Sequence, residues 1–112
     1  MIKIIYAALS KKIFYHRFSI SKFILNSNAV PINPFMNFDY YLGEGIEREK
    51  IRQANNLLAG RCDELWVFGE ISNGIKREIE IAEKNGKIIR YFLIDEDANV
   101  KEIDKQEIKF EN

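Results

Sequence analysis

The sequence predicts an α/β fold, a Rossmann-like or flavodoxin-like three-layer sandwich built on a mostly parallel β-sheet. Two observations lead to this prediction. Short apolar runs alternate along the chain with longer amphipathic segments, which is the order that βαβ units produce. The length of 112 residues fits a single domain, which we expect to cover residues 1–112, with a charged C-terminal segment at residues 95–112. Right-handed crossovers in such a domain place helices on both faces of the sheet.

The first half of the chain supplies two expected strands and one helix. Residues 2–7 form a nearly continuous apolar run, as in a strand that is buried on both faces. Residues 10–26 are predicted to be a helix, because a strand of that length would be unusual. A very short strand is expected at residues 29–32, where Pro31 and Pro34 prevent a longer ladder.

The segment 33–45 is predicted to be a long loop. Loops of this length are usually functional or disordered, and the large apolar side chains argue against disorder: Phe35, Met36, Phe38, Tyr40 and Tyr41. We expect these side chains to anchor the loop over the rest of the fold. Two alternatives remain, namely stacking of Tyr40 and Tyr41 on a nucleobase and pairing of residues 35–41 with a second copy of the chain.

The second half of the chain continues the alternation. Apolar spacing predicts a helix over residues 47–60, with Gly60 as its stop. Another helix is expected from residue 72 or 73, where a Ser or Asn cap is available, to Gly86. Strands are expected at residues 65–68 and 88–94 and, as an edge strand, at residues 107–110.

Composition excludes several classes of protein. A hydrophobic fraction of 46% and a charged fraction of 30% argue against disorder, and a formal net charge of zero argues against binding a nucleic-acid polymer. The single cysteine, Cys62, cannot form an internal disulfide, so we expect a small buried hydrophobe there. No signal peptide or membrane span is visible, which predicts a cytoplasmic protein without a membrane partner. No His/Cys/Asp cluster has metal-ligand spacing, so neither a metal nor a cofactor is expected.

Ligands of parallel α/β sheets bind beyond the carboxyl ends of the strands, which directs attention to residues 7–12, 33–45 and 69–74. The first of these segments holds Ser10, Lys11 and Lys12 at the start of a predicted helix, where free N–H groups and the helix dipole favour an anion. Residues 1–38 carry five basic side chains and no acidic one. Two interpretations stay open: a local anion site, or a plain helix cap with solvated lysines.

The segment 69–74 also leads into the start of a predicted helix and contains Ser72, Asn73 and Gly74. Glu78 follows four residues after Gly74, about one helical turn. It can therefore face back toward the strand ends, where a carboxylate could act as a nucleophile or a base. Spacing alone favours the other interpretation, a surface glutamate among charged neighbours.

Three short motifs resemble the nucleoside 2-deoxyribosyltransferase superfamily. They are CDELWVF at residues 62–68, SNGIKREIEIA at residues 72–82, and the Gly-Lys turn at residues 86–87. The segment IYAALS at residues 5–10 also resembles the superfamily's first strand and loop. The pattern is most similar to the branch of 2′-deoxynucleoside 5′-phosphate N-hydrolases and related small uncharacterised domains.

This resemblance implies roles for individual residues. Glu78 matches the glutamate that attacks the anomeric carbon, and Tyr6 matches a tyrosine that orients that carboxylate. Ser10 and Ser72 resemble residues that hold a 5′-phosphate, with Lys11, Asn73 and Gly74 beside them. The resemblance implies a nucleoside or nucleotide as the small-molecule partner and makes a homodimer the expected assembly.

The sequence also departs from the pattern of the superfamily. Asn55, or Asn56 if the helix register shifts by one, stands where the superfamily has an aspartate, and an amide cannot supply a proton as a carboxylic acid does. Glu80 replaces a glycine that usually follows the catalytic glutamate. Two hypotheses therefore remain: an N-glycosidase or deoxyribosyltransferase in which Asn55 contacts a sugar hydroxyl, and a non-catalytic module that binds or sequesters nucleotides on the same fold.

Overall fold

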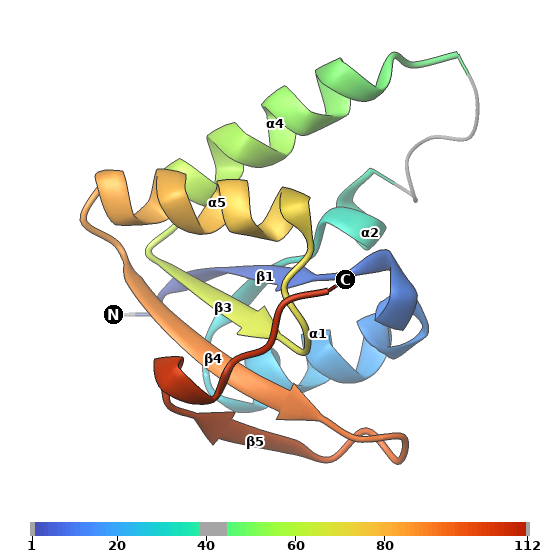
Figure 1. The fold of residues 1–112 in the computed structure, drawn as a ribbon, viewed down its shortest axis with the longest axis vertical. Helices are drawn as coiled ribbons and strands as arrows, with labels where there is room; N and C mark the ends of the chain where they lie inside the picture. The colour runs from blue at the N-terminus through green and yellow to red at the C-terminus, as the bar shows by residue number, and fades with distance from the viewer. Residues whose placement is uncertain (1, 39–44, 112) are drawn as a thin grey trace.

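The fold is built on a five-stranded sheet in the order β2-β1-β3-β4-β5, seen in a computed structural model that describes residues 2–38 and 45–111. The first four strands in chain order run parallel, and the last runs antiparallel at the sheet edge. The strands are β1 (Ile4–Leu9), β2 (Val30–Ile32), β3 (Glu64–Phe68), β4 (Ile88–Ile94) and β5 (Val100–Ile103) (Figure 1). This confirms the predicted mostly parallel α/β sheet.

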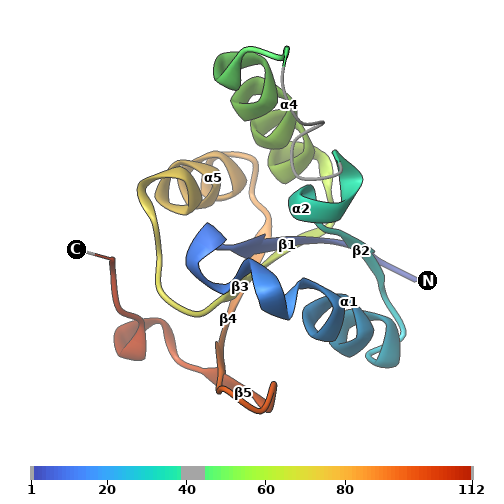
Figure 2. The same cartoon turned by 90° about the vertical axis from the view of Figure 1, so that its right-hand side faces the viewer.

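Helices cover both faces of the sheet, as right-handed crossovers require. The helix α1 (Arg17–Asn26) lies on one face, and α4 (Arg48–Arg61) and α5 (Asn73–Lys84) lie side by side on the other (Figure 2). Alternate residues of β1 point to opposite faces: Ile5 and Ala7 join the cluster under α1, whereas Tyr6 and Ala8 join the cluster under α4 and α5. The three-layer sandwich is therefore confirmed.

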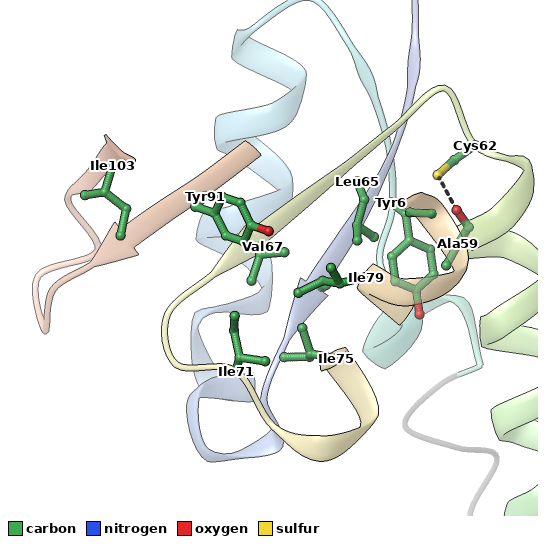
Figure 3. Close-up of a cluster of buried hydrophobic side chains, with 12 residues drawn as sticks. Tyr6, Ala59, Cys62, Leu65, Val67, Ile71, Ile75, Ile79, Tyr91 and Ile103 are labelled. Carbon is green, nitrogen blue, oxygen red and sulfur yellow. Dashed lines mark hydrogen bonds between the residues drawn. The ribbon is translucent and has the colours of Figure 1, made fainter. Parts of the chain in front are cut away.

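The cluster under α4 and α5 contains Tyr6 and the single cysteine, Cys62. Figure 3 shows Tyr6 among its members, beside Ala59 and Leu65. Cys62 lies in the same cluster and donates its thiol hydrogen to the carbonyl oxygens of Ala59 and Glu64. Cys62 is thus the small buried hydrophobe that the sequence predicts.

The N-terminal half departs from the prediction at two places. The helix expected over residues 10–26 is divided into a 3-10 segment, η1 (Lys11–His16), and α1, because the backbone of Ile13 is not helical. The predicted loop 33–45 begins with a one-turn helix, α2 (Pro34–Asn37). The side chain of Asn33 caps this helix by accepting a hydrogen bond from the N–H of Phe35. Proline is favoured in the first turn of a helix, so Pro34 starts an element instead of preventing one.

Phe35 is buried and its ring lies 6.1 Å from that of Phe14. This part of the segment anchors to the fold, as expected. Tyr40 and Tyr41 lie outside the described residues.

Gly60 does not stop its helix, contrary to the prediction. The helix α4 continues through Arg61 and ends at the extended residue Cys62. A Cβ at position 60 would lie 3.1 Å from Cγ2 of Ile81 on α5. The glycine therefore allows α4 and α5 to pack closely. In the sequence, a glycine kept for close packing cannot be distinguished from a glycine that ends a helix.

The C-terminal edge strand was predicted in the wrong place. It forms at Val100–Ile103, paired with β4, after a turn in which the Asp95 carboxylate accepts from the N–H groups of Asp97 and Asn99. Side-chain acceptors of this kind stabilise tight turns. Within the expected strand 107–110, Phe110 forms an isolated parallel bridge to Ile71, which holds the end of the chain beside the loop after β3.

No helix within the described ranges combines the length and apolar character needed to cross a membrane.

Candidate functional site

A cavity of about 830 Å³ lies at the carboxyl ends of the parallel strands. Its walls come from the residues after β1, β2 and β3, from one face of α4 and from the start of α5. It brings together the predicted residues Ser10, Lys11, Lys12, Asn55, Ser72, Asn73, Gly74 and Glu78. The edge of the sheet is the one that the general rule for parallel α/β proteins selects.

Glu78 and Tyr6 form the chemically distinctive pair of this site. Glu78 lies on the inner side of α5, together with Ile75 and Ile79, and is only 9% exposed. The fully buried Tyr6 donates its hydroxyl hydrogen to Oε2 of Glu78 at 2.6 Å. The two residues are 72 positions apart in the chain, and the sheet brings them together because β1 passes beneath α5. Glu78 is therefore not the surface glutamate that spacing alone favours.

Burial raises the pKa of the Glu78 carboxyl to about 7, and the hydrogen bond from Tyr6 opposes this increase. A carboxyl group removed from water is costly to ionise, whereas a hydrogen bond donated to its charged form favours ionisation. Near neutral pH both protonation states are populated. A carboxylate with such a pKa can act as a nucleophile or exchange a proton at physiological pH.

Replacing Tyr6 by phenylalanine removes the hydrogen bond that favours the ionised form of Glu78 and leaves the effect of burial in place. We expect the pKa of Glu78 to rise further, by about one unit, because a hydrogen bond to a charged group contributes about 1.5–3 kcal/mol. In a titration of the Glu78 side-chain carboxyl carbon followed by NMR, the midpoint near pH 7 should move to higher pH in Tyr6→Phe. The matched control is Tyr91→Phe in the same cluster; an equal displacement in both variants would contradict a specific role for Tyr6.

Ser10 and Ser72 both cap helices at the cavity. The Ser10 hydroxyl accepts from the N–H of Lys12 at 3.2 Å, and the Ser72 hydroxyl accepts from the N–H of Ile75 at 3.3 Å. Asn73 and Gly74 form the first exposed turn of α5. The structure thus confirms the caps and brings the two helix starts to one cavity, and the anion site at this place stays a prediction.

Asn55 reaches the cavity from α4. It is 7% exposed, and its Oδ1 is fully buried with no hydrogen-bond partner among the described residues. A buried carbonyl oxygen without a partner costs about 1–3 kcal/mol, and native proteins leave few of them. An acceptor of this kind at a cavity wall suits a ligand that carries an O–H or N–H group.

Several cavity residues were missed at the sequence level. Arg48 and Arg52 of α4, Arg77 of α5 and Glu111 near the C-terminus all line the cavity. The sequence did indicate Arg48 and Arg52. They lie seven and three residues before Asn55, a spacing that puts all three residues on one face of a helix. Glu111 carried no such signal, since its place depends on the backbone bonds that its segment makes with Ile71.

Two other side chains with ring nitrogens lie outside the lining of this cavity. His16 is buried in η1, and Trp66 is a core residue of β3. Across residues 2–38 and 45–111, no group of three His, Cys, Asp or Glu side chains is arranged to hold a metal ion.

The fold and site define a class: a parallel α/β domain with a buried Tyr–Glu pair beside a polar cavity at the carboxyl edge of its sheet. The chain belongs to a family described as a domain of unknown function (DUF7768), whose model matches residues 6–92. No curated protein matches the chain.

Among solved structures, the chain is similar to a 2-desoxiribosyltransferase from Leishmania mexicana, with a TM-score of 0.56 and 20% sequence identity. The match covers 83% of this chain and 65% of that one, so this chain spans slightly less than two thirds of the length of that structure. The likeness shows a shared fold, the one that the sequence motifs suggest.

Proposed function

We propose that this protein is a nucleoside or nucleotide N-glycosidase or deoxyribosyltransferase that acts through Glu78 as nucleophile. The observation that supports this proposal best is the buried Tyr6–Glu78 pair, with a hydroxyl-to-carboxylate distance of 2.6 Å, at the wall of the cavity. A buried carboxylate held by one donor has a defined orientation, which nucleophilic attack requires.

In this mechanism, an oxygen of the ionised Glu78 attacks the anomeric carbon, and the bond from that carbon to the base nitrogen breaks with its electron pair going to the base. Water then displaces Glu78 in hydrolysis, with one proton of the water balancing the released base, or a second base displaces it in transfer. Asn55 contacts a sugar hydroxyl. Ser10, Lys11, Ser72, Asn73 and Gly74 hold a 5′-phosphate, with the start of α5 adding its free N–H groups. The scheme uses neither metal nor cofactor.

The test is incubation of the protein with a panel of ribo- and deoxyribonucleosides and their 5′-phosphates, with released base measured by liquid chromatography. We expect release from at least one member and its loss in Glu78→Ala. Unchanged release in Glu78→Ala would refute the assignment of the nucleophile.

A second candidate function is non-catalytic nucleotide binding or sequestration, and Asn55 favours it. The Asn55 amide lines the same cavity as the Glu78 carboxylate and cannot protonate a departing base. This function predicts a thermal shift with a nucleotide but no released base.

For the sequestering function, we expect Lys11→Gln, Lys12→Gln and Ser72→Ala each to weaken nucleotide binding several-fold, because each removes a charge or a donor from the anion site. Isothermal titration calorimetry measures the affinities, and Lys84→Gln at the far end of α5 is the control. Full affinity in all three variants would remove the proposed site.

We also propose that the protein forms a homodimer. Sedimentation as a monomer at micromolar concentration would contradict this proposal.

A further inference from the structure

The cavity carries basic side chains at two separate places. Lys11 and Lys12 begin η1 on one side, and Arg48 and Arg52 lie in the first turns of α4 on the other. Figures 1 and 2 place η1 and the beginning of α4 on opposite sides of the beginning of α5. One bound phosphate at the caps of η1 and α5 therefore uses only one of these two pairs.

The charge of the cavity wall exceeds what a single phosphate balances. Among the described residues, five basic side chains line the cavity, against two acidic ones, Glu78 and Glu111. Within the described part of the chain, the ion-pair partners of Arg52 and Arg77 are exposed residues of their own helices, Glu49 at 3.6 Å and Glu80 at 3.9 Å. Such exposed pairs contribute little and exchange easily for a better anion.

Asn55 supports the interpretation that this wall binds a ligand. It lies on the same face of α4 as Arg48 and Arg52 but is buried where they are exposed, and its Oδ1 has no partner among the described residues. A polar acceptor kept dry and unpaired is costly, and a donor on a bound molecule removes that cost. The face of α4 therefore presents a neutral acceptor at depth and two guanidinium groups at the rim.

We propose that the preferred ligand of this site is a nucleotide with a second phosphate group, which Arg48 and Arg52 bind. The sugar lies at Glu78 and Asn55, and the first phosphate lies at Ser10 and Ser72, so this inference rests on the proposed function. Guanidinium groups suit the role because their planar donors bind phosphate oxygens in pairs. Both a 5′-diphosphate and a 3′,5′-bisphosphate supply the required chemistry.

The test measures binding by isothermal titration calorimetry in Glu78→Gln, which prevents turnover. The probes are the 5′-monophosphates, 5′-diphosphates and 3′,5′-bisphosphates of deoxyadenosine, deoxyguanosine, deoxycytidine and thymidine. We expect one doubly phosphorylated form to bind at least about tenfold more tightly than its monophosphate, the gain from one charge-assisted hydrogen bond. Which of the two forms gains identifies the position of the second phosphate.

The variant Arg48→Gln/Arg52→Gln should abolish this gain and leave monophosphate affinity within about twofold. Both side chains are exposed, so folding should persist, and circular dichroism checks it. The control is Arg61→Gln/Lys84→Gln, which changes two exposed cations at the far ends of α4 and α5.

Equal affinity for mono- and doubly phosphorylated forms, equal weakening of both by the arginine variant, or no nucleotide binding would overturn the inference. Base release from a monophosphate by the unaltered protein would meanwhile support the proposed function, so the two ideas can fail independently.

Discussion

Glu78→Gln is expected to lower base release by at least about a thousandfold, the scale of effect seen when a covalent nucleophile is removed. The amide has nearly the shape of the carboxylate and its oxygen still accepts the hydrogen from Tyr6. It lacks the negative charge that attacks the anomeric carbon. Single-turnover assays with enzyme in excess, followed by liquid chromatography of the base, measure this loss at the chemical step.

The control for this experiment is Glu80→Gln, two residues farther along α5. Glu80 is exposed and loosely paired with Arg77, so its replacement should leave base release unchanged. Comparable losses in both variants would point to a general effect on α5 and would contradict a nucleophilic role for Glu78.

The same Glu78→Gln substitution should stabilise the folded protein at alkaline pH. The pKa of Glu78 is about 7 in the fold, above its ordinary value of 4.5, so the folded state binds more protons than the unfolded state between these limits. Stability must then fall as pH rises from 4.5 to 7 and stay lowered above pH 7. The difference of about 2.5 between the two pKa values corresponds to about 3 kcal/mol of unfolding free energy. For a chain of this length, that is about 10 °C in Tm.

Thermal or urea unfolding between pH 4.5 and pH 8 tests this expectation. At the acid end, where Glu78 is neutral, wild type and Glu78→Gln should have similar stability, and the advantage of the variant should grow with pH. Glu80→Gln should follow the wild type throughout. A constant difference between wild type and Glu78→Gln at every pH would show that Glu78 does not titrate as inferred.

Together, the two expectations describe a trade of stability for reactivity. An ionised carboxylate under α5 weakens the fold, and the fold tolerates it because β1, β3 and β4 form a large apolar core below it. Stabilising substitutions at functional positions commonly reduce activity for this reason. A variant that gains stability and loses base release at the same position would be strong support for the site.

The sequence by itself determined the order of the elements and the edge of the sheet where the site lies. Apolar runs of strand length, such as residues 65–68, alternate with amphipathic runs, such as residues 73–84, and local hydrophobic period is sufficient to distinguish them. Strand alternation with helices then implies a parallel sheet, and a parallel sheet implies a ligand site at its carboxyl edge. Ser10 and Ser72 were predicted in this way, Glu78 was predicted through the motif resemblance, and the structure places all three at one cavity.

Elements whose signals depend on distant partners were predicted poorly. Gly60 looks like a helix stop, yet it lies within α4 because Ile81 of α5 needs the space. The strand β5 has little apolar pattern of its own, and it forms because β4 offers an open edge after the Asp95 turn.

Only the tertiary structure decided the chemical character of the site. Burial makes Glu78 a carboxylate with a pKa of about 7, and burial depends on packing between α5 and β1, which are far apart in the chain. The burial of Asn55 Oδ1, which has no partner among the described residues, and the placement of Arg48 and Arg52 likewise depend on where α4 docks. Local sequence sets which side chains are available, whereas desolvation and the pairing of polar groups arise from contacts between elements that no local pattern encodes.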